Sequence, residues 1–258
     1  MLSEGVMLQS THASIEYDAA AIFGAMERDG YAVIDDYLRS EDVANARESV
    51  IRKVRSNGNE TVVALHSFDN FESPFLKALP TDPKLLCLCK SVSAKGFGAA
   101  PDVALFPSLR CLTGKSAREH SMYFHYDSYA ITVIIPIIVP SNGKPGRLIV
   151  YPNTRKIRKV YFANFLDKFM SDRKSTQKFY RAMYDRGSTD LRYIDMKPGS
   201  LYLFSGYRSI HTNEEVDADQ IRATAVFHYF DPHAQSLTKK LFRLRFKIRR
   251  AMVALAGG

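Results

Sequence analysis

The second half of the chain is a succession of short segments rich in β-branched and aromatic residues, bounded by glycine, proline or polar residues. Eight of these segments are predicted as strands: Leu109–Leu112, Tyr123–Asp127, Ala130–Ile138, Arg147–Tyr151, Tyr193–Met196, Ser200–Phe204, His211–Glu215 and Arg222–Phe230. Many short strands with this punctuation are typical of a sandwich or a barrel. The sequence therefore predicts a mainly β core over residues 105–232.

A longer interruption at residues 156–190 separates the fourth and fifth of these segments. Apolar residues recur in it at every fourth position, at Tyr161, Phe165 and Phe169 and again at Phe179 and Met183. This spacing predicts two helices inserted at the mouth of the β core. We expect the aromatic stripe of the first helix to face the core and to leave Lys159 and Lys168 near the rim. The insertion would then act as a lid that shapes substrate choice.

The part before the core, residues 1–104, is expected to be a helical flank after a partly ordered lead-in at residues 1–16. Helices are predicted over 17–28, where Asp18 lies near the start, over 40–55, where Ser40 is the candidate N-cap, and over 83–92. A short strand is expected at residues 31–35.

The bulk properties fit one large domain that can bury a substantial core. The longest apolar run, residues 130–140, is too short for a membrane span and reads as a buried strand. The start of the chain lacks the basic and then apolar pattern of a secretory signal. Cys87, Cys89 and Cys111 cannot all be paired, and their spacing does not suit zinc. We therefore expect a reduced, cytoplasmic setting.

Most of the positive charge lies near the end of the chain. The formal charge of +9 falls to +2 when seven residues are left out: Lys239, Lys240, Arg243, Arg245, Lys247, Arg249 and Arg250. Residues 233–258 are predicted to contain a basic amphipathic helix, whose apolar face carries Leu237, Leu241, Leu244 and Ile248, with Leu255 further along. Three roles stay open for it: docking on the core or on a second subunit, peripheral contact with an anionic membrane, and binding of nucleic acid.

Three residues match the ligand set of a mononuclear iron site. His125 and Asp127 form a His-x-Asp pair, and His211 follows at a distance. Residues i and i+2 of a strand point to the same face, so one strand can present both members of the pair to one ion. Two histidines and one carboxylate form the facial triad that leaves coordination positions open on Fe(II). The alternative is that both histidines are hydrogen-bonded core residues.

Arg222 and Thr224 lie on one face of the last predicted strand, opposite the alanines at 223 and 225. Val226 and His228 share the parity of Arg222, and we interpret His228 as a packing residue beside the metal ligands. A buried guanidinium without a carboxylate partner is costly, so Arg222 calls for an anion. An internal salt bridge to an Asp or Glu is the alternative.

Taken together, these motifs resemble the Fe(II)/2-oxoglutarate-dependent dioxygenase superfamily, and in particular its phytanoyl-CoA-hydroxylase-like branch. The resemblance covers roughly residues 30–231. It includes Gly30–Leu38 followed by Ser40–Val43, the Gly146–Pro152 strand, and Lys197–Phe204 before the second histidine. Asn153-Thr154-Arg155 stands where members of the branch often carry a small residue, Ser and His.

The resemblance implies a double-stranded β-helix (jelly roll, or cupin-like barrel) with flanking helices and iron at one mouth. It implies Fe(II) held by His125, Asp127 and His211, and 2-oxoglutarate held by Arg222 and Thr224. O2 would then drive oxidation of a small molecule, most simply its hydroxylation, with release of succinate and CO2. A carboxylate at Asp127 favours this outcome over halogenation, because halogenating relatives have a small residue there.

Other expectations concern the substrate and the neighbouring residues. Arg110, Tyr123, Tyr126 and Thr132 are candidates to line the co-substrate pocket or to serve packing. The Tyr, Phe, Lys and Arg content of 156–190 hints at an anionic or amphipathic substrate. A nucleic-acid substrate is disfavoured, because nucleic-acid-demethylating relatives carry a second Arg where this chain has His228. The oligomeric state stays open.

Two other function classes remain at this point. One is a non-catalytic jelly-roll protein that binds or interacts without turnover. The other is a metal-dependent enzyme of the cupin type that uses no 2-oxoglutarate, and a functional requirement for Arg222 would argue against it.

Overall fold

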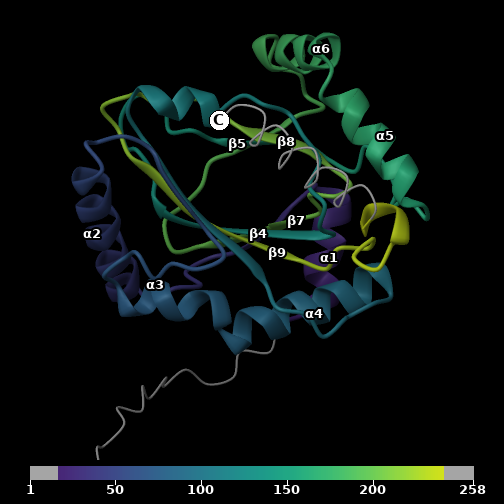
Figure 1. Ribbon diagram of the computed structural model, residues 1–258, viewed down its shortest axis with the longest axis horizontal. Helices are drawn as coiled ribbons and strands as arrows, with labels where there is room; N and C mark the ends of the chain where they lie inside the picture. The colour runs from purple at the N-terminus through teal and green to yellow at the C-terminus, as the bar shows by residue number, and fades with distance from the viewer. Residues whose placement is uncertain (1–16, 241–258) are drawn as a thin grey trace, which may run out of the picture.

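Two antiparallel sheets form the centre of the molecule (Figure 1). The computed structural model describes residues 17–240, so the lead-in at 1–16 and the basic segment at 241–258 lie outside the described residues. The larger sheet has the strand order β1 (Ala32–Ile34), β7 (Leu201–Phe204), β4 (Ile131–Ile138), β9 (Arg222–Tyr229), β3 (Phe106–Leu112) and β2 (Val62–Leu65). The smaller sheet has the order β6 (Arg192–Ile194), β5 (Leu148–Tyr151) and β8 (Ile210–Asn213).

The two sheets face each other across an apolar layer. Ile134, Tyr202 and Val226 of the larger sheet pack in one buried cluster with Leu148 and Ile194 of the smaller sheet. Among the described strands none pairs from one sheet to the other, so the sheets do not close into a continuous barrel. This is the predicted jelly roll, in its open two-sheet form.

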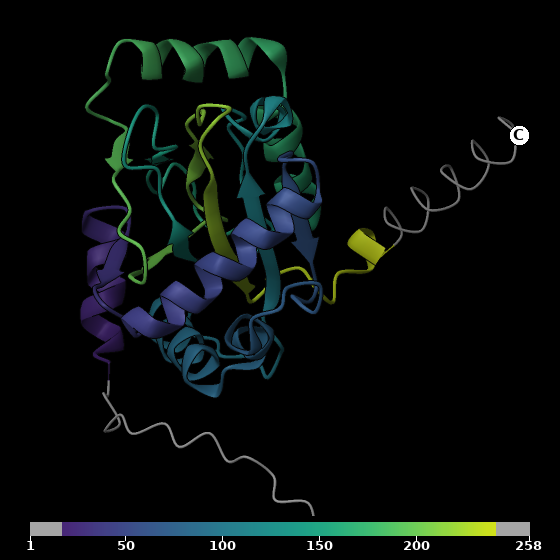
Figure 2. The ribbon, with the colours of Figure 1, turned by 90° about the vertical axis from the view of Figure 1, so that its left-hand side faces the viewer.

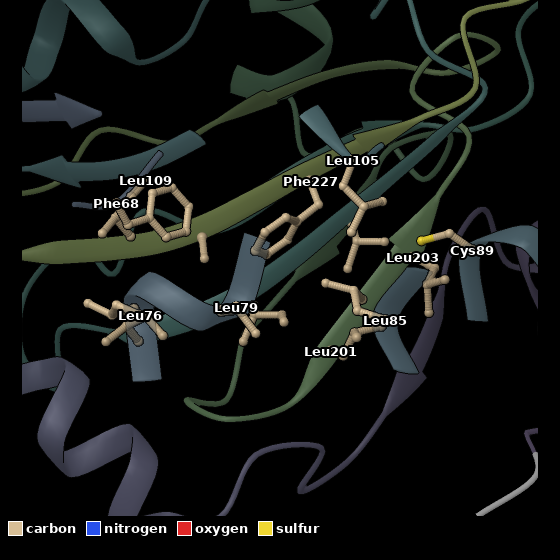
Figure 3. Close-up of a cluster of buried hydrophobic side chains, with 14 of the residues drawn as sticks. Phe68, Leu76, Leu79, Leu85, Cys89, Leu105, Leu109, Leu201, Leu203 and Phe227 are labelled. Carbon is tan, nitrogen blue, oxygen red and sulfur yellow. The ribbon is translucent and has the colours of Figure 1, made fainter. Parts of the chain in front are cut away.

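Four helices cover the outer face of the larger sheet (Figures 1 and 2). They are α1 (Ala19–Arg28), α2 (Ser40–Ser56), α3 (Pro74–Ala78) and α4 (Pro83–Phe97). Their apolar residues pack against every second residue of the strands, as Figure 3 shows for Leu85 and Cys89 of α4 beside Leu201 and Leu203 of β7. Two short 3-10 helices, η1 (Leu79–Thr81) and η2 (Lys115–His120), also occur.

Strand alternation then decides which side chains enter the space between the sheets. On β9, Ala223, Ala225 and Phe227 belong to the core under the helices. Because neighbouring residues of a strand point to opposite faces, Arg222 and Thr224 point between the sheets. The parity expected for β9 is confirmed, and it places polar residues in the interior of the jelly roll.

Several boundaries differ from the predicted ones. Ser40 is the first residue of α2 rather than its N-cap, which is Arg39 and makes no side-chain capping bond. The helix expected at 83–92 continues to Phe97, where Gly98 ends it in the left-handed conformation. The N-terminal flank also contributes β2 to the edge of the larger sheet, because Val62–Leu65 pairs with β3.

The segment expected as a strand at 123–127 forms only one ladder pair. His125 and His211 exchange two backbone hydrogen bonds of 3.0 Å, and the Asp127 amide donates to the Gly206 carbonyl at 2.9 Å. The segment therefore runs extended along β8 without being a regular strand.

The insertion forms α5 (Tyr161–Ser171) and α6 (Lys174–Asp185), as the apolar spacing predicted (Figures 1 and 2). The expected orientation of α5 is wrong. Phe165 is 37% exposed and Phe169 is 50% exposed, whereas Asn164 and Ser171 are buried. A polar network on the inner face of α5 accounts for this reversal and is described below. No helix within residues 17–240 combines the length and the apolar character needed to cross a membrane.

Candidate functional site

His125, Asp127 and His211 meet between the two sheets. Asp127 Oδ1 lies 3.7 Å from His125 Nε2, and Asp127 Oδ2 lies 3.5 Å from His211 Nε2. One ligand atom from each residue lies within 4.8 Å of the other two, and no other His, Cys, Asp or Glu group with this geometry occurs in the described part of the chain. The three predicted metal ligands are therefore brought together.

Backbone carbonyls orient both imidazole rings. His125 Nδ1 lies 2.9 Å from the Tyr123 carbonyl oxygen, and His211 Nδ1 lies 3.1 Å from the Ser209 carbonyl oxygen. A carbonyl only accepts, so in the neutral rings Nδ1 carries the proton and Nε2 keeps its lone pair. Such partners on the far ring nitrogen are common for metal-binding histidines. Both lone pairs point toward Asp127.

The charge states also suit metal binding. Burial disfavours ionisation of Asp127, but His211, His228, His125 and the Thr132 hydroxyl outweigh it and hold the pKa of this carboxyl well below its usual range. Burial lowers the pKa of His211 to about 4 against the opposing charge of Asp127. An ionised carboxylate beside a neutral imidazole is the form in which both residues bind a divalent cation.

Two close neighbours fix the position of Asp127. The Thr132 hydroxyl of β4 donates to Asp127 Oδ2 at 2.5 Å, and His228 Nδ1 lies 3.6 Å from the same oxygen. Gly206 lies so close that a Cβ built there would be 2.1 Å from Asp127 Oδ2. Only glycine fits at position 206 while the carboxylate keeps this place.

Arg222 is a buried cation without an anionic partner. Its residue surface is 2% exposed, Nη1 donates to Thr224 Oγ1 at 3.4 Å, and Nε has no hydrogen-bond partner. No carboxylate forms an ion pair with it within residues 17–240. Burial lowers the pKa of Arg222 to about 9, and the neighbouring charge of Arg110 adds to this effect. The internal salt bridge considered for Arg222 is thus absent from the described structure.

Gly146 accommodates the Arg222 side chain. A Cβ at position 146 would lie 2.5 Å from Arg222 Cδ, and Gly146 has a φ of +69°. Both the close approach and the left-handed backbone require glycine there. The guanidinium is thereby held in a defined place beside Thr224.

The candidate metal ligands and Arg222 line the same internal cavity, whose volume is about 80 Å³. His125, Asp127 and His211 line it together with Arg222 and Thr224. Of the other candidates, Arg110, Thr132 and His228 line this inner cavity, with Ser108 of β3 beside them. A chelating group on the metal and an anion on Arg222 can belong to one small molecule, because both sites open into one space.

A larger outer cleft of about 460 Å³ adjoins this inner cavity. Arg110, His125, Thr212 and Asn213 line both. Tyr123 and Tyr126 line the outer cleft rather than the inner cavity, and their expected place in a co-substrate pocket stays a prediction. Their side chains emerge from the 123–127 segment on the side of α5, whereas the inner cavity lies between the sheets.

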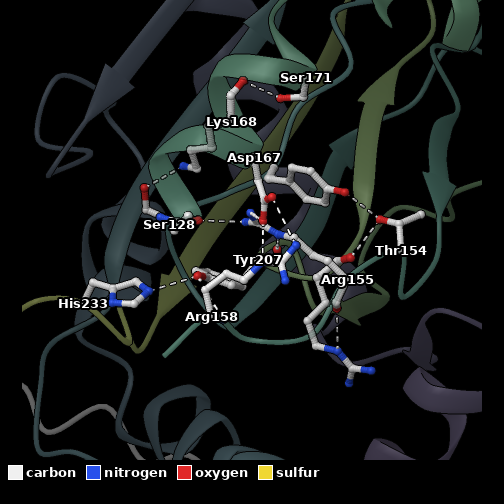
Figure 4. A network of polar contacts seen from close by, with 12 residues as sticks. Ser128, Thr154, Arg155, Arg158, Asp167, Lys168, Ser171, Tyr207 and His233 are labelled. Atoms are coloured by element: carbon white, nitrogen blue, oxygen red, sulfur yellow. Dashed lines mark hydrogen bonds and ion pairs between the residues drawn. The ribbon is translucent and has the colours of Figure 1, made fainter. Parts of the chain in front are cut away.

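A polar network holds α5 against this cleft (Figure 4). Arg155 is buried between the rings of Tyr126 and Tyr207, at 3.8 and 4.3 Å from their centroids. It donates to Asp167 Oδ2 at 2.9 Å and to Asn164 Oδ1 at 3.0 Å, both on α5. The polar face of α5 therefore turns inward, which is why its aromatic residues face outward.

The next helix supports the segment that carries His125. The Gln177 side chain of α6 accepts from the Phe124 amide at 3.1 Å and donates to the Phe124 carbonyl at 2.7 Å. The Tyr123 hydroxyl donates to Asp172 Oδ1 at 2.7 Å. The insertion thus holds the two residues that immediately precede a candidate metal ligand.

Sequence reasoning missed the roles of Arg155 and Gln177. A signal was present for Arg155, because it stands where the resembling branch often has histidine. Gln177 gave no signal, since its partner Phe124 belongs to a segment far away in the sequence.

Solved structures with the same fold are iron- and 2-oxoglutarate-dependent oxygenases. A prolyl hydroxylase from Trichoplax adhaerens, in complex with a hypoxia inducible factor peptide fragment, has a TM-score of 0.51 at 15% identity over 85% of this chain and 91% of that chain. The epimerase SnoN of nogalamycin biosynthesis, in complex with Fe3+, alpha ketoglutarate and nogalamycin RO, has a TM-score of 0.53 at 13% identity over 83% of each chain.

The carbocyclase SnoK of the same biosynthesis has a TM-score of 0.52 at 15% identity over 84% of this chain and 85% of that chain. No protein-family model and no curated protein matches the sequence. At these identities the comparisons concern the fold, and the chain shares the jelly roll of the 2-oxoglutarate- and iron-dependent oxygenases.

Proposed function

We propose that this protein is an Fe(II)- and 2-oxoglutarate-dependent oxygenase that hydroxylates a small molecule. The observation that carries the proposal is Arg222, a buried guanidinium with a free Nε that shares one cavity with two histidines and a carboxylate. Metal ligands and a fixed cation in one cavity suit a molecule with a chelating end and an anionic end. 2-Oxoglutarate has both.

His125, Asp127 and His211 would hold Fe(II), and Arg222 with the Thr224 hydroxyl would hold the distal carboxylate of 2-oxoglutarate. When bound, this pair supplies the oxidising chemistry, in which O2 is consumed, 2-oxoglutarate becomes succinate and CO2, and one oxygen atom enters the substrate. The fit is supported by SnoN, a neighbour of the same fold that was solved with Fe3+ and alpha ketoglutarate.

The chain's own residues prepare the site for this chemistry. The Tyr123 and Ser209 carbonyls accept from the two Nδ1 atoms, so each neutral ring presents Nε2 toward Asp127, and Thr132 holds the carboxylate that completes the triad. The two sheets exclude bulk water from Arg222, so a charge-assisted bond there is stronger than one at the surface. A carboxylate at position 127 occupies the place that halide takes in halogenating enzymes, which favours hydroxylation.

We also propose a branch of the superfamily and a cellular location for this protein. The phytanoyl-CoA-hydroxylase-like branch is favoured by the motifs at 30–43 and 146–152, which form β1, the start of α2 and β5. A cytoplasmic location is supported by three free cysteines, of which Cys87 is exposed.

The test is release of succinate from 2-oxoglutarate in the presence of Fe(II) and O2, with and without candidate small molecules. His125→Ala, Asp127→Ala and His211→Ala are each expected to reduce release to background, because two protein ligands hold Fe(II) poorly. His66→Asn is the control, since His66 is exposed, lines neither cavity and has a φ of +70°, which Asn tolerates. Near-normal release by two of the three variants would contradict the ligand assignment.

If the unaltered protein binds Fe(II) and 2-oxoglutarate but releases no succinate, the non-catalytic alternative is favoured, because the inner cavity then holds its ligands without consuming them.

A further inference from the structure

The outer cleft is lined by two cations that are not among the residues proposed above to hold Fe(II) or 2-oxoglutarate. Arg110 extends from β3, and Lys168 extends from the inner face of α5; both line the cleft. Arg110 also lines the inner cavity, so the two cations lie on the route from the surface to the metal ligands.

Neither cation forms an ion pair within residues 17–240. The Arg110 Nη2 donates to the His120 carbonyl at 2.9 Å, and the Lys168 Nζ donates to Ser128 Oγ at 2.8 Å (Figure 4). Burial lowers the pKa of Lys168 to about 8, although the charge of Asp127 opposes the shift. Burial also lowers the pKa of Arg110. Two partly buried cations with only neutral partners are a favourable place for an anion.

The acidic residues of the cleft do not neutralise this pair. Glu119 and Asp172 are solvent-exposed residues, and Asp172 accepts the hydroxyl of Tyr123. Exposed charges are screened by water and salt, whereas partly buried ones are screened much less. Neither exposed carboxylate therefore cancels the positive charge of Arg110 and Lys168, and Asp127, whose charge acts on both, would be balanced by Fe(II).

The charge balance of the loaded site leads to the same conclusion, if the proposed function holds. Fe(II) would be balanced by Asp127 and one carboxylate of 2-oxoglutarate, and Arg222 would balance the other carboxylate. Arg110 and Lys168 then remain as two positive charges beside the place where the substrate must enter. Tyr123, which is 48% exposed, and Tyr126 offer aromatic surface next to them.

We infer that the substrate is a small molecule with an oxyanion group, a carboxylate or a phosphate, held between Arg110 and Lys168 while its apolar body lies against the tyrosines. This inference rests on the proposed function and adds the recognition element of its substrate.

The test measures binding to the protein loaded with Fe(II) and 2-oxoglutarate under argon, by isothermal titration calorimetry. The three ligands are 3-phenylpropionate, phenyl phosphate and the neutral 3-phenylpropionamide. At least one anion is expected to bind about tenfold or more tightly than the amide, because a charge-assisted hydrogen bond contributes that much. The anion that binds more tightly identifies carboxylate or phosphate as the natural group.

Variants assign the effect to the two cations. Lys168→Gln keeps a hydrogen-bonding end for Ser128 but removes the charge, so it should lose most of the preference for the anion, and Lys168→Arg should restore it. Arg110→Gln should lose it as well. Lys178→Gln on the exposed face of α6 is the matched control and should behave as the unaltered protein does.

The inference is overturned if neither anion binds more tightly than the amide, or if Lys168→Gln and Arg110→Gln both keep the preference. Failure of the proposed function looks different, since 2-oxoglutarate itself would then not bind to the iron-loaded protein. The loading step measures this before any ligand is added.

Discussion

Replacing Arg222 by Met should stabilise the protein without ligands and remove its response to 2-oxoglutarate. Methionine is unbranched and similar in length, so it can follow the path of the arginine side chain past Gly146. The substitution removes a buried charge whose Nε has no partner. A buried polar group without a hydrogen bond costs about 1–3 kcal/mol in proteins, so Arg222→Met should gain at least about 1 kcal/mol.

Binding of Fe(II) and 2-oxoglutarate should make the unaltered protein more stable than Arg222→Met. A ligand at one hundred times its Kd stabilises the folded state by about 2.7 kcal/mol, and the unaltered protein should show such a gain with Fe(II) and 2-oxoglutarate. Arg222→Met should show little of it. The unaltered protein is thus expected to be the less stable of the two when empty and the more stable when loaded.

The difference in stability between the empty unaltered protein and Arg222→Met should also change with pH in a defined direction. The folded-state pKa of Arg222, about 9, lies below the ordinary value of 12.5, so above pH 9 the unfolded state binds more protons than the folded state. Stability rises with pH wherever the unfolded state binds more protons. The deficit of the empty unaltered protein relative to Arg222→Met should therefore shrink as the pH rises above about 9.

Urea unfolding under argon, at several pH values and with or without ligands, measures all three effects. If the empty Arg222→Met protein is clearly less stable than the unaltered one, Arg222 has a structural role and the reasoning fails. A full response of Arg222→Met to 2-oxoglutarate would also refute it.

Three further substitutions test the architecture around the site. Gln177→Ala should weaken Fe(II) binding about tenfold by releasing the Phe124 backbone beside His125. An unchanged affinity for Fe(II) in a metal titration would mean that residues 123–127 keep their conformation without the Gln177 side chain. Arg155→Leu should free α5 and uncouple the reaction, so that succinate forms without hydroxylated product; full coupling in a product assay would show that α5 does not act as a lid. Gly206→Ala should abolish Fe(II) binding, because the added Cβ would overlap Asp127 Oδ2, and a variant that binds Fe(II) normally would show that the carboxylate can move.

The strands of the core could be predicted because their signal is local. Every second residue of β9 is apolar and packs under the helices, and the polar residues of opposite parity were expected in the interior. The candidate metal ligands could be proposed from the sequence because His125 and Asp127 are two residues apart and His211 follows the Lys197–Phe204 segment. The spacing of residues along the chain was enough to predict the parity of β9 and the candidate ligand set.

The orientation of α5 could not be predicted from its apolar spacing. That spacing assumes that a helix buries its apolar face, yet Arg155 binds Asn164 and Asp167 on the opposite face. The edge strand β2 was missed for a similar reason: four residues carry little periodicity, and their pairing with β3 depends on contacts about fifty residues away. Both features arise from tertiary contacts that no short window of sequence contains.

The central claim is that one cavity holds Fe(II) on His125, Asp127 and His211 and 2-oxoglutarate on Arg222. Under argon, a 2-oxo acid chelated to Fe(II) gives a visible charge-transfer absorption that neither component gives alone. We expect this absorption to require both Fe(II) and 2-oxoglutarate, to saturate at one equivalent per chain, and to disappear in His211→Ala. Arg222→Lys should raise the 2-oxoglutarate concentration needed by about tenfold to a hundredfold, since an ammonium cannot reproduce the guanidinium fork. An absorption that never appears, or one that Arg222→Lys leaves at the same 2-oxoglutarate concentration, would contradict the account.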